Sequence, residues 1–388
     1  MTQFPQAFTQ MLSDSYGTET AARVLEALGS GNPSVSIRLN PAAGLDRPEA
    51  TPVPWSPYGF ILGERPNFTL DPLFHAGCYY VQDSSAMFVG ELLRRVLPEM
   101  APGIRVLDLC AAPGGKTTDA AASLRERFGD AFTLLANEVM RPRFSILRSN
   151  VRSWGDARVG VVSRDPAVFG AEGPCFDIII ADVPCSGEGM FRKDPRALAE
   201  WSPETVAFCA SRQRRILSDC WPALRPGGIL IYSTCTFNPE ENDAQVRWIA
   251  DNLGAGILDA GAAPGGILRT PAGGYALLPG LVPGEGQFAA VLRKDGDAPA
   301  SGDPFRIFRA EIPAAAQTLE DAPRFEVDRS TALQFLHGDA LRLPEAPLGL
   351  LTLTYRGCRL GQVKNIGSRC NNLYPKDRRI RMDIPSEL

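Results

Sequence analysis

The chain has 388 residues, of which 44% are hydrophobic and 22% are charged, with a formal net charge of −4. This composition excludes a disordered or fibrous protein, and the length is enough for two or three soluble domains. No stretch approaches the roughly 18 uncharged apolar residues of a membrane helix, and the start MTQFPQAFTQ lacks the features of a signal peptide. We therefore expect a cytoplasmic protein that has no membrane partner.

The cysteine and histidine pattern excludes two kinds of site. Nine cysteines, an odd number at scattered positions, fit reduced thiols better than a disulfide framework. No CxxC pair occurs, and the two histidines are His75 and His337. Because structural zinc sites need clustered cysteine and histidine ligands, we expect no metal.

Residues 1–100 mix helical stretches with short strands such as SVSIRL, which predicts a small α+β N-terminal domain. From residue 104, strands and helices alternate, so residues 101–295 are predicted to form a Rossmann-like α/β domain with a parallel sheet. The expected strands are IRVLDLC, FTLLANEV, RVGVVS, FDIIIADV and GGILIYSTC. The main expected helices are GKTTDAAASLRERF, RFSILRSNVRSW, SPETVAFCASRQRRILSDCWPAL and PEENDAQVRWIADN. A linker, KDGDAPASGDP, precedes a small C-terminal domain expected at 305–388.

The loop after the first strand of this domain is a candidate cofactor site. Glycines between a strand and a helix allow a tight turn and expose the N–H groups of the helix to a ligand. A P-loop is disfavoured because Cys110 occupies the position of its first glycine, and the dinucleotide pattern GxGxxG is absent. The remaining candidate is S-adenosylmethionine (SAM). The loop residues are Cys110, Ala111, Ala112, Pro113, Gly114, Gly115 and Lys116.

Four successive strands of this domain end near an acid: Asp108, Glu138, Asp165 and Asp182. Ligands of such sheets bind at the carboxyl ends of the strands. Glu138 is placed to accept both ribose hydroxyls of SAM, and Asp165 to accept from the adenine amino group. Taken singly, Glu138 also fits a surface glutamate and Asp165 an ordinary loop aspartate.

Cys110, Cys185 and Cys235 each stand at or just after a strand exit. A packing role suits Cys110, whose loop has a cofactor role without it, whereas Cys185 and Cys235 are interpreted as chemical groups. The chemistry that needs a thiol beside SAM is methylation of a pyrimidine ring carbon: a thiolate adds to carbon 6 and makes carbon 5 nucleophilic. Composition and placement leave open which of the two cysteines is the nucleophile.

Basic clusters suggest a nucleic-acid partner despite the acidic total. Those at 141–152 and 212–215 fit a solvated helix face equally well. The segment EGMFRKDP, residues 188–195, offers arginine and aromatic side chains for an unstacked base. Near the C-terminus, Asn371, Asn372 and Tyr374 accompany a basic cluster, which favours phosphate and base contacts. That cluster is Lys364, Arg369, Lys376, Arg378, Arg379 and Arg381.

The blocks DLCAAPGGKT, ADVPCSGEGMFRK and YSTCTFNPEEN resemble the signatures of the Sun/nucleolar-protein family of RNA cytosine-5 methyltransferases. The resemblance is strongest to bacterial members that modify small-subunit ribosomal RNA. SVSIRLNP, VPWSPYGFIL and DPLFHAGCYYVQDSSAMF resemble the leader domain of that family, so roughly residues 1–295 are covered. VKNIGSRCNNLYPKDRRIRM is similar, less specifically, to the RNA-binding tail of the same branch. One departure is Gly115, where members often have serine.

The resemblance implies Cys235 as the nucleophile and Cys185 as the thiol that assists release of the methylated RNA. It also places Asp182 between cofactor and target base, and it implies SAM binding by the glycine loop, Glu138 and Asp165. The implied partner is ribosomal RNA or the small ribosomal subunit, and we expect a monomer. Three alternatives stay open: methylation of transfer RNA, methylation of a small molecule or protein, and a SAM-binding RNA assembly factor without turnover.

Overall fold

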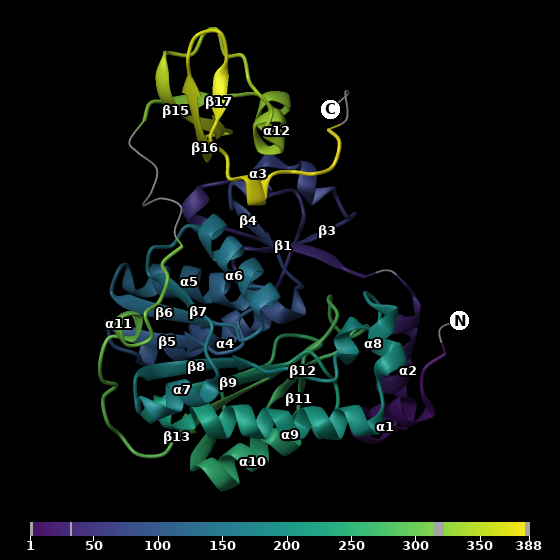
Figure 1. Cartoon of the computed structure of the whole chain (residues 1–388). Helices are drawn as coiled ribbons and strands as arrows, with labels where there is room; N and C mark the ends of the chain where they lie inside the picture. Colours follow the sequence, from purple (N-terminus) through teal and green to yellow (C-terminus); the bar gives the residue numbers. More distant parts are fainter. Residues whose placement is uncertain (1–2, 32, 314–321, 385–388) are drawn as a thin grey trace.

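A computed structural model of the chain describes residues 3–31, 33–313 and 322–384 (Figure 1). Its central part is one large sheet. The strands are β5 (Ile104–Asp108), β6 (Phe132–Asn137), β7 (Val159–Val162), β8 (Phe176–Asp182), β9 (Leu224–Thr234), β10 (Ala255–Leu258), β11 (Leu268–Arg269), β12 (Tyr275–Leu277) and β13 (Gln287–Lys294). Their order is β11-β12-β13-β9-β8-β5-β6-β7, with β10 also paired to β13. Strands β5 to β9 are parallel and β13 is antiparallel to β9, which confirms the predicted Rossmann-like core.

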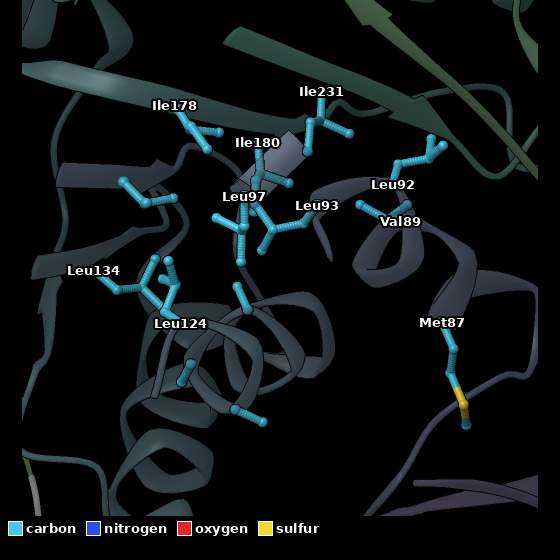
Figure 2. Packing of buried hydrophobic residues seen from close by; sticks show 14 of the residues in the cluster. Met87, Val89, Leu92, Leu93, Leu97, Leu124, Leu134, Ile178, Ile180 and Ile231 are labelled. Carbon is cyan, nitrogen blue, oxygen red and sulfur yellow. The ribbon is translucent and has the colours of Figure 1, made fainter. Parts of the chain in front are cut away.

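Helices cover both faces of this sheet because its strands alternate between two cores. Ile178 and Ile180 of β8 belong to one core, and Ile179 belongs to the other. Figure 2 shows the first core, where Ile180 lies beside Leu93 and Leu97. The helices of the first core are α4 (Phe88–Val96), α5 (Gly115–Phe128) and α6 (Arg141–Trp154). The core on the opposite face of the sheet, called the second core below, includes α7 (Pro166–Ala171), α9 (Pro203–Cys220) and α10 (Asp243–Leu253).

The N-terminal part joins a helix pair to a small sheet. The pair is α1 (Gln6–Tyr16) and α2 (Thr18–Gly29), which lies beside α8 (Pro195–Glu200) in Figure 1. Phe8 of α1 packs edge-on against Phe191, with ring centroids 5.2 Å apart, so this pair supports the loop after β8. The sheet consists of β1 (Val35–Leu39), β2 (Thr51–Pro52), β3 (Gly59–Leu62) and β4 (Tyr79–Val81), in the order β2-β3-β1-β4. The short helix α3 is Pro72–His75.

The C-terminal part has its own core, formed by α12 (Arg329–His337) and a four-stranded sheet. The strands are β14 (Arg324–Glu326), β15 (Gly349–Tyr355), β16 (Cys358–Asn365) and β17 (Cys370–Asn372), in sequence order. Leu70 contributes to this core, so the N- and C-terminal parts touch. The described helices include none that is long and apolar enough to cross a membrane.

The segment around α11 (Pro304–Ile307) packs on the central sheet, although we expected the C-terminal domain to begin at 305. The Phe308 ring lies 4.7 Å from that of Phe169 and stacks on Phe176 at 5.9 Å. Glu311 pairs with Val161 of β7 through two backbone hydrogen bonds, 2.7 and 3.1 Å long. By packing, residues 304–311 therefore belong to the central part, because their apolar side chains complete its second core.

Candidate active site

The glycine loop joins β5 to α5 and is held by side chains of α6. Gly114 has φ = 112°, a conformation that favours glycine, and it caps α5. Arg143 Nη2 donates to the Ala112 carbonyl at 2.7 Å, and Asn150 Nδ2 donates to the Pro113 carbonyl at 2.8 Å. Both donors lie on α6. The loop therefore has a defined shape in which the first N–H groups of α5 are available to a ligand.

Two buried carboxylate oxygens beside this loop lack a hydrogen-bond partner among the described residues. Asp108 Oδ2 accepts from the Thr117 hydroxyl at 2.6 Å, but Oδ1 has no partner. Glu138 Oε1 accepts from the Met140 N–H at 2.8 Å, but Oε2 has only the Arg143 guanidinium at 3.3 Å, without hydrogen-bond geometry. Burial raises the pKa of Asp108 to about 7. Unused acceptors at neighbouring strand ends suit a ligand that brings hydroxyl or ammonium donors.

Asp165 follows β7 and is exposed. Its Oδ1 accepts from the Ala167 N–H at 3.1 Å and caps α7. The structure thus shows a capping role, while the contact with adenine stays a prediction.

Asp182 ends β8 and forms an ion pair with Lys116 of the glycine loop. Lys116 Nζ lies 2.8 Å from Asp182 Oδ2, and Ser233 Oγ donates to Oδ1 at 2.7 Å. Burial lowers the pKa of Lys116, but attraction to Asp182 and, more weakly, to Cys235 raises it to a net value above the usual one. Lys116 is therefore a fixed cation between the glycine loop and the strand-exit thiols.

The two strand-exit thiols lie together. Cys185 follows β8, Cys235 follows β9, and their Sγ atoms are 3.2 Å apart. Asp182 and Ser233 are paired in register, which brings the two exits side by side. The hydrogen bond to Cys235, followed by burial, raises the pKa of Cys185 well above its usual value. Cys110, the third exit cysteine, has a pKa raised by burial and packs against the second core.

Glu241 holds the two thiol loops together, and the sequence analysis missed this role. We expected PEENDAQVRWIADN to be helical, but α10 begins only at Asp243. Residues 239–242 form turns, because Asn242 Nδ2 donates back to the Thr236 carbonyl at 2.9 Å. The buried Glu241 carboxylate accepts from the Ser186 N–H at 3.0 Å and from Gln213 Nε2 at 2.9 Å. An acid inside a predicted amphipathic helix carries no sequence signal for such a tertiary contact.

The loop at 188–195 does not present its predicted RNA-contacting side chains. Phe191 is buried beside Phe8, and Arg192 is only 9% exposed, with its Nε 2.7 Å from Glu285 Oε2. Glu188 is fully buried and accepts from the Phe237 N–H at 2.7 Å. These residues tie the loop to the N-terminal part and to the turn after Cys235. The interpretation of Phe191 and Arg192 as base contacts is therefore wrong for this conformation.

A similar correction applies near the C-terminus. Tyr374 is buried in the C-terminal core, and Asn372 Nδ2 donates to the Phe335 carbonyl at 2.8 Å. Arg378 Nη2 donates to the Ser153 hydroxyl on α6 at 2.6 Å. These three side chains stabilise the C-terminal part and its contact with α6. The exposed members of the predicted surface are Lys364, Arg369, Asn371, Lys376 and Arg381. No group of three or more histidine, cysteine, aspartate or glutamate side chains within the described ranges is arranged to hold a metal ion.

Comparison with known proteins assigns the three parts to one family. A model described as 16S rRNA methyltransferase RsmB/F matches residues 97–253. Models for the N-terminal domain and the PUA domain of RsmF match residues 4–84 and 322–380. A curated Ribosomal RNA small subunit methyltransferase F from Klebsiella pneumoniae is 36% identical over 345 residues, which is 83% of this chain and 70% of that protein. The chain belongs to the RsmB/F family.

Further comparisons, with a curated relative and with solved structures, agree with the fold. The Ribosomal RNA small subunit methyltransferase F of Salmonella paratyphi C is 39% identical over 269 residues, 66% of this chain and 53% of that protein. The chain thus spans about half the length of several curated relatives. A methyltransferase homolog from Pyrococcus horikoshii superposes with a TM-score of 0.62 at 28% identity, over 75% of this chain and 95% of the other. NSun6 from the same organism shares the fold, with a TM-score of 0.64 at 19% identity, over 76% of this chain and 99% of the other.

The cofactor of this RsmB/F chain is SAM, as the glycine loop predicts. The unused oxygens of Asp108 and Glu138 fit its donor groups. The loop at 110–116 lies beside them and turns its helix N-terminus to the same edge of the sheet. The family resemblance seen in the sequence is confirmed.

Proposed function

We propose that this protein methylates carbon 5 of a cytosine in small-subunit ribosomal RNA through a covalent bond between cysteine and cytosine. The observation that carries the proposal is the pair of thiols 3.2 Å apart at the exits of β8 and β9, beside the Lys116–Asp182 pair. Transfer to a nitrogen or oxygen atom needs no thiol nucleophile. A ring carbon of low nucleophilicity does.

The residues divide the work as follows. The Cys235 thiolate adds to carbon 6 of the cytosine, and the electron pair of the 5,6 double bond is displaced toward carbon 5. When bound, SAM supplies an electrophilic methyl group. Carbon 5 forms its new bond to that methyl group as the methyl–sulfur bond breaks, and the electron pair of that bond stays on the departing sulfur. The Cys185 sulfur, as thiolate, then takes the proton from carbon 5, and the Cys235 sulfur is expelled as a thiolate when the 5,6 double bond re-forms. The ammonium of Lys116 stabilises the nearby thiolate, and Asp182 keeps Lys116 oriented.

The assignment of the nucleophile to Cys235 rests on the family resemblance. The Sγ contact is symmetric, so distance alone does not separate the two thiols. We assign Cys185 to product release, because its sulfur lies 3.2 Å from that of Cys235 and can take the carbon 5 proton whose removal lets the Cys235 sulfur leave. Under this assignment, Cys235 is needed to form the covalent bond and Cys185 is needed to break it.

The test is methyl transfer from tritiated SAM to small-subunit ribosomal RNA that lacks the modification, followed by mapping of 5-methylcytosine. Cys235→Ala should abolish transfer. Cys185→Ala should still form the methylated base but accumulate a protein–RNA adduct that survives denaturing electrophoresis. Reversed behaviour of the two variants would overturn the roles. Methyl transfer retained in both variants would overturn the covalent mechanism.

A further inference from the structure

Arg38 is a fully buried arginine of the N-terminal sheet that reaches the cofactor loop. It lies on β1, and its Nη2 donates to the Gly115 carbonyl at 3.1 Å and to the Thr118 hydroxyl at 2.5 Å. Gly115 closes the glycine loop and begins α5, while Thr118 stands one turn later. The Arg38 guanidinium therefore makes two hydrogen bonds to the first turn of α5, whose N-terminus follows the glycine loop.

The guanidinium has further contacts through Nε and its planar face, whereas its buried Nη1 has no hydrogen-bond partner among the described residues. Nε donates to Gln82 Oε1 at 2.8 Å and lies 3.8 Å from Asp119 Oδ2, while the group stacks over the Trp154 ring at 4.7 Å. Asp119 belongs to α5 and Trp154 ends α6. Burying a charged pair carries a desolvation cost that an apolar contact avoids. A planar fork with several donors, however, fixes orientation in a way that an apolar side chain cannot.

Two other side chains of the N-terminal part, Tyr80 and Gln82, also pack against the glycine loop. A Cβ atom placed on Gly115 would lie 3.3 Å from Tyr80 and 3.4 Å from Gln82, so the loop touches both. Asn150 Nδ2 contacts the Tyr80 hydroxyl at 3.3 Å while it donates to the Pro113 carbonyl. In Figure 1, β1 and β4 lie next to α5 and α6, in agreement with these contacts. The loop is thus braced by a part of the chain that precedes the methyltransferase fold.

We propose that Arg38 is a positioning residue for SAM: by holding the Gly115 carbonyl and the Thr118 hydroxyl, it sets the orientation of the cofactor loop. The N-terminal part is then a component of the cofactor site. This inference depends on cofactor binding alone and not on which RNA atom is methylated, so it can fail independently of the proposed function.

The test compares Arg38→Lys with Arg94→Lys in the full chain. Lysine keeps the charge but cannot reproduce the fork. Arg94 also pairs with Asp119, at 3.2 Å, but its hydrogen bonds and ion pairs within the described residues do not reach the glycine loop, so it is the matched control. Binding of S-adenosylhomocysteine is measured by calorimetry, together with KM for SAM, KM for RNA and the thermal midpoint.

For Arg38→Lys we expect a Kd about tenfold higher and an equal rise in KM for SAM, with KM for RNA unchanged. Arg94→Lys should change the Kd less than about twofold.

A purely structural role predicts a different result. The thermal midpoint of Arg38→Lys would then fall while the Kd of the folded protein stayed at the wild-type value, and this would overturn the proposal. Equal effects of the two lysine variants on the Kd would also overturn it. Should Arg38→Lys fail to fold, Thr118→Val removes one of the two anchored groups with little change in shape, and a weaker rise in the Kd, about threefold, is expected. An unchanged Kd in Thr118→Val would count against the proposal.

Discussion

The Glu241 carboxylate accepts the backbone N–H of Ser186 at 3.0 Å. Ser186 follows Cys185 directly, and Glu241 lies in the turn that follows Cys235, so this contact joins the loops of the two thiols. The hydroxyls of Ser186 and Thr236, 3.0 Å apart, make a second link. The spacing of the thiols is therefore set by buried polar contacts as well as by the register of the strands.

Glu241→Ala should separate the loops and slow methyl transfer. The change leaves the Ser186 N–H and one Gln213 donor unpaired in a buried site, which costs about 1–3 kcal/mol of stability. We expect kcat to fall at least about tenfold while the affinity for S-adenosylhomocysteine is kept. Unfolding in urea and single-turnover kinetics would measure the two effects. Wild-type kcat in a destabilised variant would show that Glu241 supports the fold and not the thiols.

Glu241 should also make stability fall as the pH rises. Burial raises the pKa of Glu241 to about 7. Between its ordinary value near 4.5 and 7, the folded protein keeps a proton that the unfolded chain has released, so the stabilisation present below this window is lost across it. Glu241→Gln should make the decline of the thermal midpoint from about pH 5 to pH 7 less steep. Some slope should remain, because the pKa of Asp108 is raised in the same direction. A slope identical to that of the wild type would contradict the shift at Glu241.

Cys185 should become more reactive when its partner is removed. The hydrogen bond to Cys235 is the largest cause of its raised pKa, so Cys235→Ala lowers that pKa and increases the thiolate fraction. Alkylation of Cys185 by iodoacetamide near neutral pH, followed by mass spectrometry, should be several-fold faster in Cys235→Ala than in the wild type. Cys175, a buried free cysteine packed in the second core, serves as the internal reference. Equal rates at Cys185 would indicate that burial alone controls its reactivity.

Glu138→Gln should weaken cofactor binding without affecting RNA. Replacing the carboxylate removes an acceptor whose Oε2 has no hydrogen-bond partner among the described residues. We expect the Kd of S-adenosylhomocysteine to rise about tenfold and the Kd of RNA to stay within about twofold. Glu126→Gln, at an exposed position of α5, is the control and should change neither constant. A loss of RNA affinity in Glu138→Gln would point to a role in the substrate site.

Removal of the C-terminal part should leave cofactor binding intact only if residues 304–311 are kept. A chain that ends after Pro313 keeps Phe308 in the second core and should bind S-adenosylhomocysteine normally, with weaker RNA binding. A chain that ends after Ala300 loses Phe308, and Phe308→Ala alone should cost about 3–5 kcal/mol. Calorimetry and filter binding on the two truncated chains test this. Equal loss of both ligands after Pro313 would contradict a separate role for the C-terminal part.

Some features of this protein follow from the sequence alone. Apolar strands that alternate with helices predict the parallel sheet, because period-2 burial and helical patterning are local properties. Glycines at a strand exit and an acid near the end of each strand place the cofactor loop, Asp108, Glu138 and Asp182, since the carboxyl ends of parallel strands meet at one edge. The same rule brings Cys185 and Cys235 to neighbouring exits.

The tertiary structure decided what depends on contacts between distant segments. Phe191 points inward because its ring packs against Phe8, and Arg192 because it forms an ion pair with Glu285. Both partners are distant in sequence, so the local pattern does not predict these contacts. No sequence motif predicts the hydrogen bonds of Glu241 to Ser186 or of Arg38 to Gly115, because the partners of a buried polar side chain are set by the tertiary fold. The sequence therefore determined which residues stand at the edge of the sheet. Only the packing of three parts against one another decided which of them lie beside the glycine loop, which contact each other and which support the loops of the site.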